Sequence, residues 1–236
     1  MIVPYKEFYG KNIDRMSELI AEGRVPLSKA GIMERRLNST LSAWKDNYFG
    51  SDDAIAYNSD EKFKIVRSAP FLRLLTPESN LTNGSLVLTG SVYDSADGAE
   101  FSRKDKGLIF DRDLTAQEAK EHPVWLALVP DKALLTEYVD YMFAEMDQRF
   151  NYKRAMGVYI AGVPNVYNAR ALCVDRLGCG SRLYGRDGLD YDDGRLVGVA
   201  PEALGASGKM IVKLNLETAI GVVNKHLHAG RNLRVQ

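Results

Sequence analysis

The sequence contains little cysteine, which excludes two common kinds of small-protein scaffold. It has 2 cysteines in 236 residues, too few for a disulfide framework. Cys173 and Cys179 alone cannot form a structural zinc site, and their C-x5-C spacing lacks the tight C-x2-C knuckle that zinc modules favour. We therefore interpret both as small buried thiols in a reducing compartment.

Long apolar segments are absent as well. The longest purely apolar run covers residues 124–129, far short of the roughly 20 residues that a membrane helix requires. The first eleven residues lack the long apolar region of a signal peptide. These features predict a cytoplasmic protein that has no membrane partner.

Neither sign of charge is in excess. Lysine and arginine together number 31, as do aspartate and glutamate, so the formal net charge is zero. A neutral chain has no overall attraction to nucleic acid, and such binding would need a local basic patch. The apolar content of 45% and the charged content of 26% are typical of a soluble globular protein, and a chain of this length can bury a sizeable core.

Helical and strand-like patterns are grouped along the chain. Helical spacing of apolar residues or a helix-start signal indicates helices at 13–22, 28–44, 115–121, 122–129, 131–149 and 215–230. Short β-like runs lie at 54–57, 63–66, 85–89, 156–161, 171–174, 196–200 and 210–214. We expect one α+β domain over residues 1–236, with a helical subregion at 1–50 and a sheet-containing body at 51–236. Its helices would pack on a mixed, mainly antiparallel sheet.

Several local signals fix turns and helix starts. Asn83-Gly84 predicts a tight turn, and Thr115 with Glu118 forms the T-x-x-E pattern of a capping box. His122 precedes a proline at the start of a helical segment, which indicates a structural or surface role for this histidine. On the helix at 131–149, a stripe of Leu, Val, Met and aromatic residues predicts core packing rather than a cofactor pocket.

The most informative stretch is residues 173–195. It holds five Gly, five Asp and four Arg, with no Lys, Glu or His. Such a composition is unlike a packed core element, and it suits either a ligand site or a solvated loop whose charges satisfy one another. Standard phosphate-binding signatures fail: the G-x-G at 178–180 lacks its third glycine, and the P-loop-like residues 205–209 are two residues too short.

If the stretch is a site, arginine forks and glycines would hold an anion. Arg176, Arg182 and Arg186 would clamp a phosphate or carboxylate, while Gly178 and Gly180 would present backbone N–H groups.

The carboxylates of the same stretch have two possible roles. Asp187, Asp190 and Asp192 would act as a catalytic base or as metal ligands. Asp190 and Asp192 share a face if the segment is extended, and they would then bind a divalent cation. Otherwise these carboxylates pair with arginine and turn outward.

The lead hypothesis is therefore an enzyme or ligand-binding protein for a phosphate- or carboxylate-bearing small molecule. Whether it is an enzyme, which further cofactor it takes and its oligomeric state are left open. The alternative is a nucleic-acid-binding or assembly protein that uses the helix pair at 13–44, with Lys29, Arg35 and Arg36 facing DNA. The neutral charge argues against nucleic acid, and the pair can equally be an αα-hairpin packed on the sheet.

Overall fold

The computed structural model describes residues 4–58, 61–162 and 166–201. Within it, Met1–Ala200 forms one compact unit. The predicted strand at 210–214, the predicted helix at 215–230 and the residues 205–209 lie outside the described residues. The single domain over all 236 residues therefore stays a prediction.

The order of elements mixes helices with short strands. The helices are α1 (Asn12–Ala21), α2 (Lys29–Asn38), α3 (Ala43–Asp46), α4 (Pro70–Arg73), α5 (Gly90–Ser95), α6 (Ala116–Glu121), α7 (Pro123–Leu128), α8 (Lys132–Phe150) and the short 3-10 helix η1 (Leu177–Cys179). The strands are β1 (Tyr5–Tyr9), β2 (Val25–Pro26), β3 (Phe49–Tyr57), β4 (Lys62–Val66), β5 (Leu81–Thr82), β6 (Ser85–Val87), β7 (Ala99–Ser102), β8 (Val158–Ile160), β9 (Asn168–Val174), β10 (Leu183–Gly185) and β11 (Arg195–Val199).

The described strands form two sheets. The larger has the order β5-β6-β9-β3-β4-β7, and β10 joins it by pairing with both β9 and β8. Only the β8–β10 pair is parallel in this described part. The smaller sheet, β1-β11-β2, is antiparallel. The predicted α+β fold with a mixed, mainly antiparallel sheet is confirmed.

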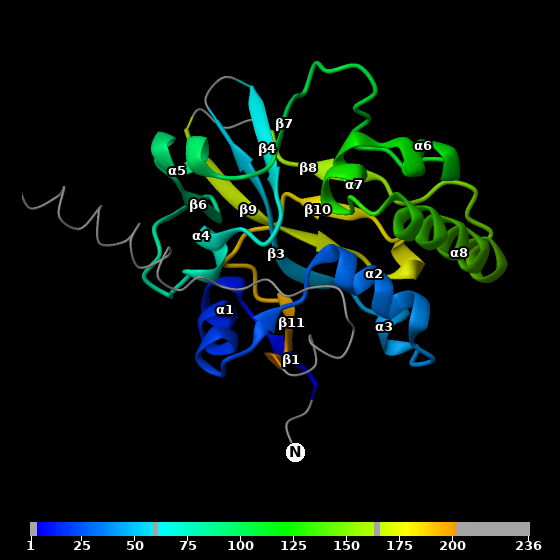
Figure 1. Ribbon diagram of the computed structural model, residues 1–236, viewed down its shortest axis with the longest axis horizontal. Helices are drawn as coiled ribbons and strands as arrows, with labels where there is room; N and C mark the ends of the chain where they lie inside the picture. The colour runs from blue at the N-terminus through cyan, green and yellow to red at the C-terminus, as the bar shows by residue number, and fades with distance from the viewer. Residues whose placement is uncertain (1–3, 59–60, 163–165, 202–236) are drawn as a thin grey trace, which may run out of the picture. The chain divides into compact units, whose positions relative to one another are not determined.

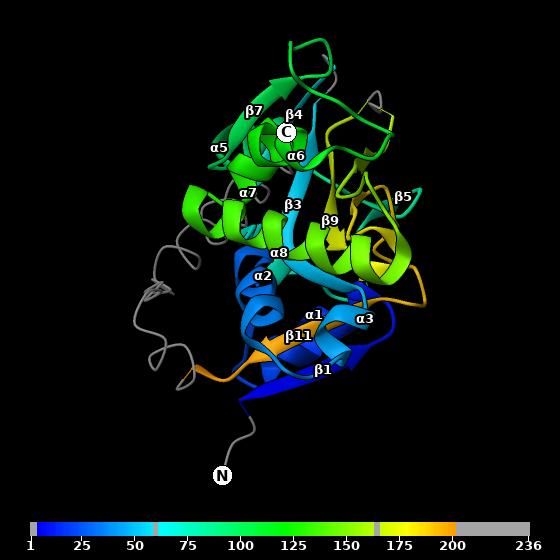
Figure 2. The same cartoon turned by 90° about the vertical axis from the view of Figure 1, so that its right-hand side faces the viewer.

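Helices cover the larger sheet from different sides. In Figure 1, α6, α7 and α8 lie to one side of the long strands β3 and β9, while α4 and α5 lie to the other. Figure 2 shows α8 crossing these strands next to α2, against which it packs. No helix among the described residues has both the length and the apolar character needed to cross a membrane.

The apolar stripe of α8 is buried, as the sequence predicts. The side chains that face the core are Leu135, Tyr138, Val139, Met142 and Met146. Asp131 caps the helix, since its Oδ1 accepts hydrogen bonds from the N–H groups of Ala133 and Leu134 at 3.0 and 3.2 Å. The stripe therefore packs the core.

The predicted single helix at 28–44 is wrong, because the chain forms two helices there. α2 ends at Asn38, and Ser39 takes an extended conformation with ψ of 132°. The Ser39 hydroxyl accepts a hydrogen bond from the Leu41 N–H at 3.1 Å. Serine side chains compete in this way with the helical backbone, so the helix is interrupted before α3.

The strands β1, β2, β5, β7 and β10 and the helix α5 have no counterpart among the predicted elements. β10 is three residues long, too short to show a strand periodicity. β1 pairs with β11, a strand almost two hundred residues away. The N-terminal region therefore contributes strands as well as helices.

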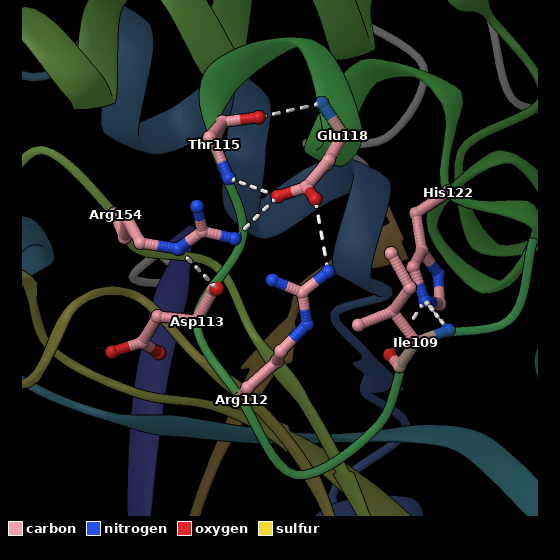
Figure 3. A network of polar contacts seen from close by, with 7 residues as sticks. All are labelled: Ile109, Arg112, Asp113, Thr115, Glu118, His122 and Arg154. Carbon is pink, nitrogen blue, oxygen red and sulfur yellow. Dashed lines mark hydrogen bonds and ion pairs between the residues drawn. The ribbon is translucent and has the colours of Figure 1, made fainter.

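The junction between α6 and α7 confirms the capping signals (Figure 3). Thr115 Oγ1 accepts from the Glu118 N–H at 3.2 Å, and Glu118 Oε2 accepts from the Thr115 N–H at 2.7 Å. His122 Nδ1 accepts from the Val124 N–H at 3.3 Å, and Nε2 lies 2.9 Å from the Ile109 carbonyl oxygen. His122 is thus the N-cap of α7, and it caps as a neutral ring whose Nδ1 carries no proton.

Truncation of the α8 stripe should destabilise the protein strongly. Leu135→Ala removes a side chain that is 1% exposed, and we expect a loss of roughly 2–5 kcal/mol in urea-induced unfolding. Glu137→Ala, on the exposed face of the same helix, should change stability by less than about 0.5 kcal/mol. Equal losses in the two variants would contradict the assigned face.

Stability should fall on mild acidification because of His122. Burial lowers the pKa of His122 below its usual 6.5, so the unfolded chain binds the proton more readily than the folded protein. Stability from this group is complete above about pH 6.5 and decreases as the pH falls below it. Urea unfolding at pH 7.5 and 5.5 should differ by up to about 1.4 kcal/mol from this group. His122→Asn, which keeps a capping side chain, should remove that part of the difference, and an unchanged pH dependence would exclude the assignment.

Candidate functional site

Residues 173–195 fold into part of the core, so the expectation that they form no packed element is wrong. They contain the end of β9, the turn at η1, strand β10 and the first residue of β11. Leu177, Leu183 and Leu189 are fully buried. Apolar leucines spaced through the stretch anchor it, while its charged residues other than buried Arg195 remain at least partly exposed.

A cavity of about 230 Å³ opens beside this stretch. Its walls come from the start of α1, the start of β3, the end of β9, strand β10 and the turns that lead into β11. Three carboxylates and three phenols line it: Asp175, Asp187, Asp193, Tyr48, Tyr184 and Tyr191. The remaining lining residues are Asn12, Cys173, Arg195 and the glycines Gly50, Gly188 and Gly194.

Backbone hydrogen bonds hold the turns of the cavity wall to distant segments. The Leu189 N–H donates to the Gly84 carbonyl at 2.8 Å, and the Leu189 carbonyl accepts from the Ile13 N–H at 3.0 Å. Gly84 has φ of +73°, and a Cβ there would lie 2.7 Å from both Asp190 Oδ1 and the Gly188 Cα. The predicted Asn83-Gly84 turn is confirmed, and glycine is required at its second position.

Buried Arg36 holds the backbone of the lining residue Asp175. Its Nη2 donates to the backbone carbonyl of Asp175 at 2.8 Å and to that of Asn47 at 2.8 Å. Its Nη1 donates to the hydroxyls of Tyr138 and Ser181 at 2.9 and 3.0 Å, and its Nε donates to a further carbonyl at 2.8 Å. One rigid fork therefore joins α2, α8 and both ends of the turn that precedes β10.

A β-bulge positions the opposite wall. The register of β3 against β9 shifts between Gly50 and Ala54. Lys29, which is 1% exposed, donates through Nζ to the Leu172 carbonyl at 2.7 Å and the Phe49 carbonyl at 3.2 Å. Burial lowers the pKa of Lys29 to about 8. The ammonium thus donates hydrogen bonds to backbone carbonyls of β3 and β9. These two strands place Gly50 and Cys173 in the wall of the cavity.

The basic residues of the N-terminal helix pair do not face solvent for DNA binding. Lys29 and Arg36 are buried, and the Arg35 guanidinium stacks 4.2 Å from the centre of the Tyr5 ring and 5.3 Å from that of Trp44. All three basic side chains therefore make contacts inside the fold. The helix-pair hypothesis is therefore not favoured.

The cavity wall is rich in acceptors and poor in available positive charge. Burial raises the pKa of both Asp175 and Asp187. Arg195 is the only cation among the described residues that line the cavity, and its Nε and Nη2 contact Glu7 Oε2 at 3.1 and 2.5 Å. Its guanidinium also lies 4.8 Å from the centre of the Tyr9 ring. The positive charge of Arg195 is therefore matched by Glu7.

None of the three arginines proposed as an anion clamp lines this cavity. Arg182 contacts both carboxylate oxygens of Asp113 at 2.8 and 2.7 Å. Arg186 lies over the stacked rings of Tyr159 and Tyr184, 5.3 and 5.1 Å from their centres. Arg176 contacts a cysteine of η1. Arg182 and Arg186 share the Tyr159 ring, but Arg182 is already paired with a carboxylate.

The glycines proposed as backbone donors belong to the turn at η1. Gly180 has φ of +80°, and its N–H donates to the Leu177 carbonyl at 2.8 Å. The carbonyl of Gly178 accepts from the Tyr152 hydroxyl at 3.0 Å. The Gly180 N–H is thus used within the turn.

The proposed carboxylates separate into different surroundings. Asp187 lines the cavity, whereas Asp190 and Asp192 do not. Turns interrupt the chain at 189–190 and 192–193, so the extended conformation assumed for a shared face is wrong. Asp192 instead lies 3.6 Å from Lys11 Nζ at the surface. In the part of the chain that the structure describes, no three His, Cys, Asp or Glu side chains gather closely enough to hold a metal ion.

Sequence reasoning missed most of the lining. Asp175, Tyr184 and Asp193 lie inside the stretch that it singled out, and their polar or aromatic character was a usable signal. Asn12 and Tyr48 come from segments more than a hundred residues away, and no local pattern connects them to the site.

Comparisons with known proteins identify the fold only. No family model and no curated protein matches the sequence. A solved structure described as "Accommodation of massive sequence variation in Nanoarchaeota by the C-type lectin fold" matches 83% of this chain and 97% of its own, with a TM-score of 0.64 and 17% identity. The chain has a C-type lectin fold. At this identity the likeness leaves the ligand of this C-type lectin-fold chain open.

Removal of Arg36 should destabilise the C-type lectin fold severely. Arg36→Ala leaves several buried acceptors without a donor, and we expect a loss of at least about 3 kcal/mol in urea unfolding. Arg36→Lys keeps the charge but loses the planar fork, so it should recover only a small part. Full recovery by lysine would show that charge alone matters.

Proposed function

We propose that this protein is a ligand-binding module, and that the cavity with its tyrosine rim is the binding site. The observation that carries the proposal is a cavity with a lining residue held by buried Arg36 and a rim that is exposed and aromatic. Tyr191 and the nearby Tyr9 are each 57% exposed. Tyrosine provides a large, amphipathic contact area at a low cost in side-chain entropy, which is why binding surfaces are rich in it.

The arrangement of scaffold and turns supports recognition. Residues 187–194 form surface turns that are held at both ends by backbone hydrogen bonds, and binding residues are commonly placed on loops positioned by a rigid scaffold. The structural neighbour is described as accommodating massive sequence variation on the C-type lectin fold. A similar tolerance here would leave the turn residues free to specify a ligand.

The chemistry of the lining favours binding over nucleophilic catalysis. Burial raises the pKa of the Cys173 thiol to about 12, so it stays protonated at neutral pH and is a poor nucleophile. His122 serves as a helix cap in another part of the fold. Catalysis by Asp187 stays a prediction from the sequence.

The ligand class predicted from the sequence has weaker support at this cavity. A phosphate- or carboxylate-bearing molecule would need cations in the wall, whereas three carboxylates line it. The remaining support for an anion is exposed Arg186 above its two tyrosine rings.

Selection from a displayed peptide library tests the proposed site. We expect peptides selected on the wild-type protein to bind the Tyr191→Ala variant at least about tenfold more weakly, as for an aromatic residue at an interface centre. Tyr152→Ala, a tyrosine exposed at another place, is the matched control and should bind normally. Selected peptides that bind the Tyr191 and Tyr184 variants as tightly as the wild type would place recognition elsewhere.

A further inference from the structure

We infer that the cavity receives a basic side chain, the guanidinium of an arginine or the ammonium of a lysine, from a protein partner. This inference rests on the proposed function, because it names the ligand class of the same site. It also reverses the sign of charge that the arginines of the sequence suggest. The reasons are the charge of the wall, its hydrogen-bonding groups and its aromatic rim.

The charge of the wall is negative. Asp175, Asp187 and Asp193 line the cavity, and Arg195, the one cation among the described lining residues, is paired with Glu7. Arg186 and Arg170 act on Asp187 from outside this lining. Arg195 is only 7% exposed and is held between aromatic rings. A cationic group that entered the cavity would meet carboxylates, whereas an anion would be repelled by them. Opposite charges at an interface in this way select the partner and guide its approach.

The wall offers acceptors in excess of donors. Each of its three carboxylates has two acceptor oxygens when ionised; Asp175 Oδ1 already accepts from the Arg176 N–H at 2.8 Å, and the Asp193 side chain is hydrogen-bonded to Tyr191. The Tyr48 hydroxyl already donates to the Asp193 carbonyl. Asn12, which also lines the cavity, has a buried side-chain oxygen with no hydrogen-bond partner among the described residues. A guanidinium group carries five N–H donors and no acceptor, so it complements this wall better than a ligand with both kinds of group.

The size and the rim of the cavity suit the end of a long side chain. A volume of about 230 Å³ is several times the roughly 30 Å³ that one water occupies in the liquid, so a guanidinium with part of its stem fits. The Tyr184 ring is already stacked on Tyr159 beside Arg186, but Tyr191 lines the cavity and is 57% exposed, and a cation is attracted to the face of such a ring.

The surroundings indicate a protein as the source of the cation. Tyr191 lines the cavity and is exposed, exposed Tyr9 contacts the lining residue Arg195, and the Arg186 guanidinium lies over the lining residue Tyr184. Tyrosine and arginine are the residues enriched at protein interfaces. These residues offer a contact surface larger than one small cation can cover. They therefore suit a folded protein partner that inserts one basic side chain into the cavity.

A titration with small probes tests the inference. Nα-acetyl-arginine methylamide is added to ¹⁵N-labelled protein, and the backbone resonances of residues 187–195 are followed by NMR. The citrulline analogue, which replaces the guanidinium by a neutral urea of similar shape, is the control ligand. We expect saturable shifts with the arginine amide and at least tenfold weaker binding of the citrulline amide.

Charge variants locate the interaction. Asp187→Asn should weaken binding of the arginine amide by about tenfold, as expected when a partner of a close charge pair is removed. Asp97→Asn removes the same charge from an exposed position between α5 and β7 and should leave binding unchanged. The spectrum of each variant shows whether it is folded, and Asp193→Asn repeats the test if Asp187→Asn is not.

The remaining outcomes separate this inference from the proposed function. Equal binding of the two amides, or tighter binding of inorganic phosphate, would overturn the cation but keep the cavity as a ligand site. Tighter binding of spermidine than of an arginine-containing hexapeptide would overturn the protein source. If the arginine amide causes no shifts at a concentration 50 times a millimolar Kd, the inference is also overturned. The proposed function is tested separately, by the peptide selection.

Discussion

The arrangement of this protein depends on one buried arginine. Arg36 is completely excluded from solvent and donates to acceptors from α8, from the turn before β10 and from the segment that leads into β3. A guanidinium can be buried without great cost only if its donors are satisfied. Its five donors in a fixed plane therefore determine where these elements lie relative to α2, and the end of β9 with Asp175 is set by the same contacts.

The neighbouring bulge in β3 follows a similar rule. Where the β3–β9 register shifts, backbone carbonyls lose their normal ladder partners, and the Lys29 ammonium takes that place. Asp53, on the bulge, accepts from the Lys29 N–H at 2.6 Å and from the Ser68 N–H at 2.9 Å. Bulges commonly occur next to functional sites because they redirect a strand. Here the bulge follows directly after Gly50, at the wall of the cavity.

Residues 173–195 carry five Asp and four Arg, close to balance in the sequence, but these charges separate in space. Arg182 pairs with Asp113, Arg195 pairs with Glu7, and Arg186 lies on tyrosine rings. Arg182, Arg186 and Arg195 therefore make contacts with other segments, whereas Asp175, Asp187 and Asp193 line the cavity. The net charge of a stretch therefore does not give the charge of the site that it forms, because the fold determines which residue each charged side chain pairs with.

The sequence by itself determined the features that depend on a few neighbouring residues. The capping box at Thr115, the turn at Gly84 and the buried face of α8 each follow from local geometry and periodicity. The α+β class follows from how such segments are grouped. The stretch that borders the cavity was also recognisable, by its glycine, arginine and aspartate content.

Only the tertiary structure decided which of its charges face the cavity, and which residues from α1 and β3 join them. It also decided that Lys29 and Arg36 are buried, although basic residues on a helix normally indicate a solvent-exposed face. Their acceptors, such as the carbonyls of Leu172 and Asp175, lie more than a hundred residues away in the sequence. The free energy of burying a charge depends on those distant partners, so no local pattern can reveal it.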